Sequence, residues 1–224
     1  MTAASRVLVA ASSAASVLMI AAPAGAATVA TSPCVRTAPG VSVQQPISGS
    51  GFVPGSQVTL KAAPAGSTSP LTLTSVTADA AGNFVTAASP PSFNPFSRKL
   101  QTFNLGAFDP AGALLAATKF EKVEVGYTTN PSSGSPTRSA LHTVRGFPAG
   151  RNIYLHFRFQ GQTKRNVKVG RAAAPCGVAS KRMALLPTRS RPGRWTVYVD
   201  QKSTYSKNTS PQLKGSFTIR RTFG

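Results

Sequence analysis

Residues 51–60 read GFVPGSQVTL and residues 146–155 read GFPAGRNIYL, so the chain carries two versions of one pattern. The two stretches lie 95 residues apart, and the same offset aligns Gly82 with Gly177. The gap of 31 residues between the first glycine of each stretch and this later glycine is therefore repeated. Chance agreement in a chain rich in Ala and Val does not explain both pairs of glycines. The sequence predicts two tandem copies of one structural unit.

Further along the chain, the alignment of the two halves continues after the deletion of one residue. With the offset reduced to 94, Phe103 matches Val197 and Val123 matches Phe217. Apolar residues meet apolar residues over most of both halves, which predicts that the two copies bury corresponding strands.

The segments between clusters of Gly, Pro, Ser and Thr alternate apolar and polar residues with a period of two. In IYLHFRF, this alternation predicts that Ile153, Leu155, Phe157 and Phe159 point inward and that Tyr154, His156 and Arg158 point outward. In WTVYVD, it places Trp195, Val197 and Val199 inward and Tyr198 and Asp200 outward. Frequent turn residues without a sustained helical period predict an all-β sandwich or barrel.

The stretch SGSGFVPGSQVTL, followed by VTADAAGNF, resembles the immunoglobulin-like repeats of exported and cell-surface bacterial proteins. In that family a Gly-Phe-x-Pro-Gly turn precedes the second strand, and an Asp-x-x-Gly-Asn-Phe hairpin follows the third. Residues 49–84 contain both elements, whereas the second half keeps GFPAG and replaces the hairpin by APCGVA. The resemblance implies two tandem immunoglobulin-like antiparallel β-sandwich domains. Such domains serve as spacers, adhesion modules or accessory domains.

Residues 1–26 have the layout of a secretory signal peptide. Arg6 precedes an apolar run over residues 7–22, and residues 24–26 form an A-x-A cleavage pattern. The run is shorter than a membrane-spanning helix and contains three serines. No later segment could span a bilayer, so we expect a secreted, extracytoplasmic chain after cleavage.

The two cysteines, Cys34 and Cys176, lie in different halves of the chain, so no bridge within one half is possible. In an exported protein they are permitted to pair, which would join the two domains. The alternative is two isolated thiols.

The boundary between the two predicted domains is expected near residues 127–139. This stretch, YTTNPSSGSPTRS, contains two prolines and has no hydrophobic periodicity, as a linker or an interdomain turn would. The alternative for its early part is the last strand of the first domain. We therefore expect one domain over residues 27–126 and a second over residues 127–224.

The charge is distributed unequally between these two domains. Residues 28–126 hold six Lys/Arg and four Asp/Glu, a net charge of +2, whereas residues 127–224 hold eighteen Lys/Arg and one acidic residue, a net charge of +17. A field of this size attracts polyanions and is screened by salt.

A basic face with aromatic residues is predicted on the second domain, on the condition that its strands are neighbours. Its candidate residues are Tyr154, His156, Arg158, Lys164, Arg165, Lys168, Tyr198 and Arg220. Such a face could contact an anionic envelope polymer, an acidic polysaccharide or, without sequence specificity, nucleic acid. In the competing interpretation these are ordinary cross-strand pairs on a solvated surface, with Arg158 paired to Asp200.

The sequence does not indicate an enzyme. Its two histidines and two cysteines do not have metal-ligand spacing, no family signature surrounds Cys176, and Asp200 is alone in its half. No cofactor is expected, and each histidine is interpreted as structural. Trp195 alternates with inward valines, so we expect a core residue rather than a carbohydrate platform.

These observations favour a secreted, non-catalytic binding module of the cell envelope or the extracellular space. Its second domain would contact an anionic polymer through the basic face. The alternative is a structural spacer or a protein-interaction module that has no polyanion site, and whose protein partner the sequence does not identify.

Overall fold

The computed structural model describes residues 26–94, 99–187, 189 and 191–220, so the predicted signal peptide lies outside the described residues except for its last position. The first half contains eight strands: β1 Thr28–Thr31, β2 Cys34–Thr37, β3 Gln45–Ser50, β4 Gln57–Pro64, β5 Leu71–Thr77, β6 Phe84–Ala88, β7 Leu100–Phe108 and β8 Leu114–Glu124. The second half contains seven: β9 Gly126–Asn130, β10 Ser139–Arg145, β11 Asn152–Phe159, β12 Gln162–Arg171, β13 Ala179–Ala184, β14 Gly193–Asp200 and β15 Leu213–Ile219.

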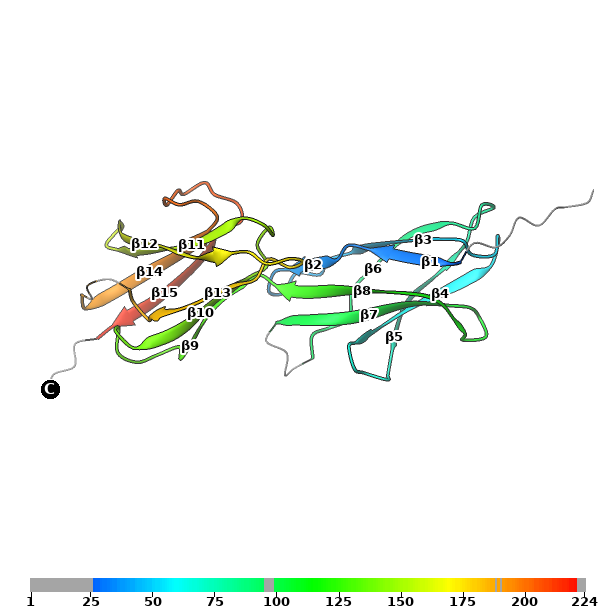
Figure 1. Ribbon diagram of the computed structural model, residues 1–224, viewed down its shortest axis with the longest axis horizontal. Helices are drawn as coiled ribbons and strands as arrows, with labels where there is room; N and C mark the ends of the chain where they lie inside the picture. The colour runs from blue at the N-terminus through cyan, green and yellow to red at the C-terminus, as the bar shows by residue number, and fades with distance from the viewer. Residues whose placement is uncertain (1–25, 95–98, 188, 190, 221–224) are drawn as a thin grey trace, which may run out of the picture.

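Each half is a sandwich of two sheets. In the first half, sheet β1-β3-β6 packs on sheet β2-β8-β7-β4-β5, in which β2 runs parallel to β8 and all other pairs are antiparallel. In the second half, sheet β13-β10-β9 packs on sheet β12-β11-β14-β15. This distribution of sequential strands between two sheets is that of immunoglobulin-like sandwiches. The prediction of two tandem immunoglobulin-like domains is confirmed, and the two sandwiches lie end to end (Figure 1).

Each sandwich has its own hydrophobic core, built from the inward positions of the period-two pattern. The first core includes Val58, Leu60, Phe103, Leu105 and Phe120, and the second includes Ile153, Leu155, Phe157, Trp195 and Val197. Trp195 is 1% exposed, and its indole Nε1–H donates to the carbonyl oxygen of Arg191 at 2.9 Å. Its predicted role as a core residue is confirmed.

A backbone hydrogen bond explains why the glycine spacing is repeated. The N–H of Phe52 donates to the carbonyl oxygen of Gly82 at 3.0 Å, and the N–H of Phe147 donates to that of Gly177 at 3.4 Å. Both acceptor glycines have positive φ, 76° and 62°. A Cβ on Gly82 would lie 2.2 Å from the oxygen of Phe52, so only glycine fits at this close approach.

The strand ladders correct the later part of the sequence alignment. Leu105 lies opposite Ala62, and Val197 lies opposite Phe157, which is 95 residues after Ala62. Val197 therefore corresponds to Leu105 and not to Phe103. Phe103 corresponds instead to Trp195.

The same correction applies to the last strand of each sandwich. Phe103 pairs with Phe120, and Trp195 pairs with Phe217. Phe217 therefore corresponds to Phe120 and not to Val123, and in both sandwiches two aromatic residues face each other on the last two strands.

The connection between the two sandwiches is a single residue, because β8 ends at Glu124 and β9 begins at Gly126. The N–H of Val125 donates to the carbonyl oxygen of Thr37 at 2.9 Å, while the side chain of Val125 packs against the second core. The interpretation of residues 127–139 as a linker is therefore wrong. They form β9 and the turn that leads to β10, and a turn inside a domain has the same composition as a linker.

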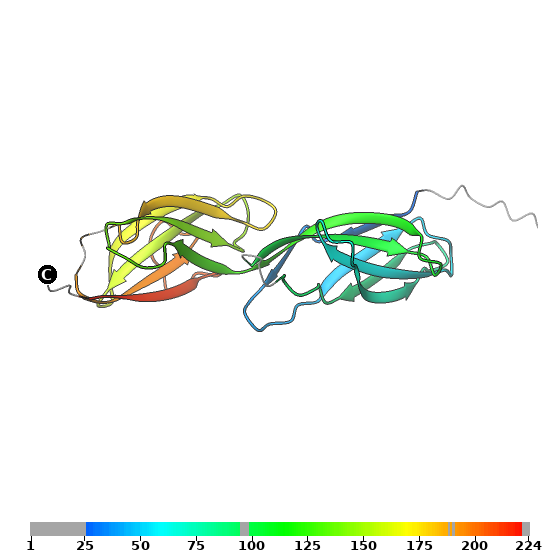
Figure 2. The same cartoon turned by 90° about the horizontal axis from the view of Figure 1, so that it is seen from below.

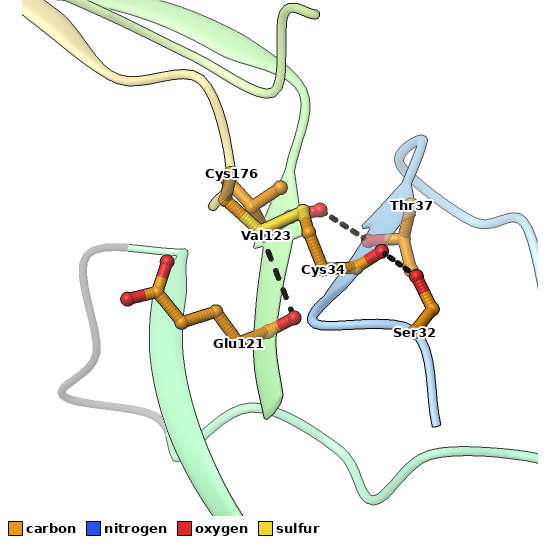
Figure 3. The surroundings of a disulfide bond; sticks show 6 residues. All are labelled: Ser32, Cys34, Thr37, Glu121, Val123 and Cys176. Atoms are coloured by element: carbon orange, nitrogen blue, oxygen red, sulfur yellow. Dashed lines mark hydrogen bonds between the residues drawn. A yellow bond between two sulfur atoms is a disulfide. The ribbon is translucent and has the colours of Figure 1, made fainter. Parts of the chain in front are cut away.

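Of the two alternatives for the cysteines, the structure contains the disulfide between the sandwiches (Figure 3). Cys34 begins β2, and Cys176 lies in the turn before β13, with 142 residues between them in sequence and 5.2 Å between their Cα atoms. The carbonyl oxygen of Cys176 accepts from the N–H of Gly146 at 3.0 Å. The connection at Val125 and the disulfide therefore join the sandwiches at two places, which opposes bending between them. The sandwiches also lie end to end in the view turned by 90° (Figure 2).

We expect Gly82→Ala to destabilise the first sandwich more than Gly112→Ala. Both glycines have positive φ, which costs an alanine about 1–2 kcal/mol, but a Cβ at Gly112 has no neighbour within 4 Å. The clash of the new Cβ at position 82 with a backbone oxygen adds about 1–3 kcal/mol. Urea denaturation of both variants measures the difference, and equal losses would contradict the role assigned to Gly82.

Removal of the disulfide by Cys34→Ser and Cys176→Ser should loosen the junction and lower the free energy of unfolding. In the chain-entropy view, a cross-link over 142 residues contributes roughly 5 kcal/mol. Hydrogen exchange should become faster at the Val125 amide, which bonds to Thr37 next to the bridge. The reduced wild-type chain is the control and should behave like the double variant; unchanged exchange would show that the junction does not need the bridge.

Candidate functional site

The candidate site is the outer face of sheet β12-β11-β14-β15. The register places Tyr154 between Lys168 and Asp200, and Tyr198 between His156 and Lys214. β12, β11, β14 and β15 are therefore neighbours in one sheet. The predicted basic face required these strands to be neighbours.

The loop over residues 201–212 folds back over this face from the end of β14. Tyr205 of the loop lies with its ring centroid 4.8 Å from that of Tyr198 and 5.9 Å from that of His156. Gln212 anchors the loop by donating from Nε2 to Asp200 Oδ2 at 3.0 Å and to the carbonyl oxygen of Ser206 at 2.8 Å. Sequence reasoning missed Tyr205, because a loop has no periodicity from which the position of its side chains follows.

His156 is wholly buried, so its predicted place on an exposed face is wrong. Its Nε2 lies 3.0 Å from Asp200 Oδ1 and its Nδ1 lies 2.7 Å from Asn166 Oδ1. Asp200 is also buried, and the N–H of Lys202 donates to its Oδ1 at 2.8 Å. His156 and Asp200 do lie at outward positions of their strands, as the alternation predicts. The loop that carries Tyr205 covers both positions.

Arg158 does not pair with Asp200. Its guanidinium lies over the ring of Tyr205, with Cζ 4.0 Å from the centroid, and 5.7 Å from the centroid of Tyr198. One amino group donates to the carbonyl oxygen of Gly161. Burial and the contact with Tyr198 raise the pKa of Tyr205, against the smaller opposite effect of Arg158. Arg158 is half-buried at the centre of the face, held between the two tyrosine rings and the carbonyl oxygen of Gly161.

The exposed cations of the face surround this aromatic centre. Lys168 lies on β12, Arg194 on β14 and Lys214 on β15, and the Nζ of Lys214 is 5.9 Å from the ring centroid of Tyr198. These three side chains project on the same side of the sheet as Tyr154 and Tyr198. Sequence reasoning did not include Arg194 or Lys214 among the candidates, although the alternation along their strands could have placed both.

Three other predicted residues lie at the margin of the face. Arg165 is exposed but lies opposite the inward-facing Phe157, so it belongs to the edge of the sheet. Lys164 is exposed beside a register irregularity and donates to Gln162 Oε1 at 2.6 Å. Arg220 is exposed just beyond the end of β15.

The other histidine, His142, is part of the second sandwich's interior. Its Nδ1 lies 2.8 Å from the hydroxyl of Tyr127, and its Nε2 lies 3.1 Å from the carbonyl oxygen of Ala184. The neutral tautomer that donates from Nε2 and accepts at Nδ1 satisfies both contacts. Burial lowers the pKa of His142, against the smaller opposite effect of the Ala184 carbonyl. Within the described residues, no cluster of three His, Cys, Asp or Glu could hold a metal ion.

Comparisons with protein families and with curated proteins find no match to this chain. Among solved structures, the human OSCAR ligand-binding domain is 12% identical with a TM-score of 0.36, over 86% of this chain and 97% of that one. The D00-D0 domain of intimin is 9% identical with a TM-score of 0.37, over 87% and 100%. A marsupial T cell receptor is 11% identical with a TM-score of 0.33, over 87% and 62%. At these values the likenesses transfer no function, and the fold assignment rests on the strand order.

None of the described residues belongs to a helix long and apolar enough to cross a membrane.

The buried, neutral His142 predicts that acid destabilises the chain. An unfolded histidine binds a proton below pH about 6.5, whereas folded His142 resists protonation until a lower pH. The free energy of unfolding should therefore fall below pH 6.5, by at most about 1.4 kcal/mol per pH unit from this residue. Denaturation of the wild type and of His142→Phe between pH 7.5 and 5 measures it.

The variant should show a shallower fall in stability with pH, and Tyr127→Phe, which retains the histidine, should keep most of the slope. Equal slopes in the wild type and in His142→Phe would contradict the assignment.

Proposed function

We propose that this chain is a secreted, non-catalytic binding module whose second sandwich contacts an anionic polymer through the outer face of sheet β12-β11-β14-β15. The proposed ligands are an anionic polymer of the cell envelope or an acidic polysaccharide, and nucleic acid would bind only without sequence specificity.

The observation that carries this proposal is the state of Asp200. It is the only carboxylate side chain of residues 127–224, where eighteen Lys and Arg stand against it. Because Asp200 is buried and bonded to His156, Lys202 and Gln212, it neutralises no exposed cation. Neither of the two ion pairs among the described residues involves a Lys or Arg of this half. The exposed cations are therefore available to an external anion.

The aromatic centre of the face supports the same proposal. Tyr154, Tyr198 and Tyr205 are half-buried, so part of each ring faces outward among Lys168, Arg194 and Lys214. Side chains of this kind contact the apolar faces of sugars or bases while the cations contact the charged groups. Export is supported by the signal-peptide layout and by the disulfide, because disulfides persist in oxidising compartments.

A second candidate function, a rigid spacer, is favoured by the junction. One connecting residue and one disulfide join the sandwiches, and this arrangement holds two modules at a constant separation without any ligand. The spacer predicts no selective polymer binding, so one experiment separates the two functions.

The test compares two triple variants of the mature chain that lose the same charge. The face variant is Lys168→Ser, Arg194→Ser and Lys214→Ser; the control is Arg138→Ser, Arg151→Ser and Arg182→Ser, which are exposed elsewhere on the second half. Binding to a teichoic acid, an acidic polysaccharide and duplex DNA is measured between about 50 and 500 mM salt.

The face variant should lose affinity for the preferred polymer, with a salt dependence that becomes shallower by roughly 0.9 for each lost phosphate contact to duplex DNA. The control should stay close to wild type. Equal losses in both variants, or equal binding to every polymer, would mean that only total charge matters and would favour the spacer.

A further inference from the structure

A groove runs along the open edge of the second sandwich, at the margin of the basic outer face. It has a volume of about 730 Å³ and lies between β15 and the segment that contains β9 and the following turn. Its apolar lining includes Tyr127, Leu185, Leu186, Phe217 and Ile219. β15 is the last strand of its sheet, so the outer side of this strand has no partner strand on it.

The first sandwich shows what occupies the corresponding place. There, β2 pairs in parallel with β8, from Cys34 opposite Glu121 to Thr37 opposite Glu124. Val35 and Thr37 of β2 are buried against the first sandwich, while Arg36 is exposed. β2 thus closes the edge of its sheet with a short strand of alternating inward and outward side chains.

The second sandwich lacks this closing strand. Phe120 of β8 corresponds to Phe217 of β15, so the part of β15 equivalent to the segment under β2 begins at Thr218. Thr218, Ile219 and Arg220 all line the groove. Thirteen residues separate β1 from β3, but only eight separate β9 from β10. The shorter connection turns directly back into β10 and contributes no strand that pairs with β15.

Gly215 shows that the groove is open rather than filled by side chains. It lies opposite the buried Val197, at an inward position of β15, and it lines the groove. A Cβ added to it would meet no atom within 4 Å. A side chain can therefore enter between the sheets at this position.

We propose that this groove binds an extended segment of an acidic partner protein, which adds to β15 as a parallel strand in the way that β2 adds to β8. Apolar or β-branched residues at alternate positions would enter the groove, as Val35 and Thr37 do in the first sandwich. Arg220 is the only charged residue among the groove's lining residues, and Asp200 is buried, so acidic groups of the partner meet only positive charge here. A second copy of the chain is disfavoured as the occupant, because it would bring another half of net charge +17 to the same edge. The groove shares Arg220 with the margin of the basic face, but the residues changed in the polymer-binding test, Lys168, Arg194 and Lys214, do not line it.

The test uses synthetic peptides patterned on residues 31–39. The probe carries Cys34→Ser and Arg36→Glu, and a second peptide keeps Arg36. Binding to the full mature chain is followed by NMR up to millimolar peptide, and hydrogen exchange is measured along β15. We expect the acidic probe to bind more tightly than the peptide with Arg36 and to protect amides of residues 218–220, the part of the edge that corresponds to the segment paired with β2.

Two variants of unchanged charge locate the binding site. Gly215→Leu places a side chain in the groove and should weaken binding of the acidic probe by about tenfold or more. Thr196→Leu adds the same side chain on the outer face and should leave binding unchanged. Slower hydrogen exchange along β15 when the acidic probe binds is measured in the wild type and needs no variant. The proposal therefore stays testable if Gly215→Leu fails to fold.

Three results would overturn the proposal. The first is that the acidic probe does not bind at millimolar concentration. The second is that Gly215→Leu leaves binding of the probe unchanged. The third is that the chain dimerises through β15 in the absence of peptide. Binding lost in the variant of Lys168, Arg194 and Lys214 but kept in Gly215→Leu would assign the peptide to the basic face, which also overturns the groove site. The polymer-binding results do not depend on any of these outcomes.

Discussion

The backbone contact between Phe147 and Gly177 determines how the second sandwich is built and how it joins the first. The carbonyl oxygen of Phe147 occupies the space where any side chain at position 177 would begin, since a Cβ there would lie 1.6 Å from it. The turn must therefore pass close to this backbone with a glycine in a left-handed conformation. Cys176 is the preceding residue, and its own carbonyl oxygen bonds to the N–H of Gly146. The contact that closes the sandwich thus also holds one sulfur of the disulfide at the junction, where β2 of the first sandwich presents Cys34.

Burial of the second half's only carboxylate side chain affects both the interior beneath the Tyr205 loop and the surface above it. Below the loop that carries Tyr205, Asp200 is satisfied by His156, a backbone N–H and Gln212, so the buried charge has partners. Above the loop, the surface of the second half therefore exposes no carboxylate side chain among its described residues. Burial of Asp200 therefore accounts both for a stabilising hydrogen-bond network and for a strongly positive exterior. His156, which the sequence placed on the outward face, is part of that network.

The two sandwiches differ most at one edge, although they share a fold. In the first, the chain crosses after β1 and β2 closes the sheet; in the second, it turns back and β15 stays open. The connection between β9 and β10 is shorter than the one between β1 and β3, and a groove with an apolar lining lies beside the free edge of β15. The tandem arrangement therefore combines a domain of nearly balanced charge, in which β2 closes one sheet edge, with a strongly basic domain in which β15 has no partner strand on its outer side.

The sequence by itself determined the β class, the two copies and the charge imbalance. These follow from local rules: the side-chain period along a strand, the turn that admits only glycine at Gly82 and Gly177, and the count of ionisable groups. Only the tertiary structure decided that His156 is buried, that residues 127–139 belong to the second sandwich, and that Phe217 corresponds to Phe120. A loop that folds over a sheet leaves no periodic signal, a turn inside a domain has the composition of a linker, and strand register is defined by hydrogen bonds between distant segments. The open edge of β15 was also decided only by the tertiary structure. The absence of a partner strand can be recognised only once the order of strands in the sheet is known.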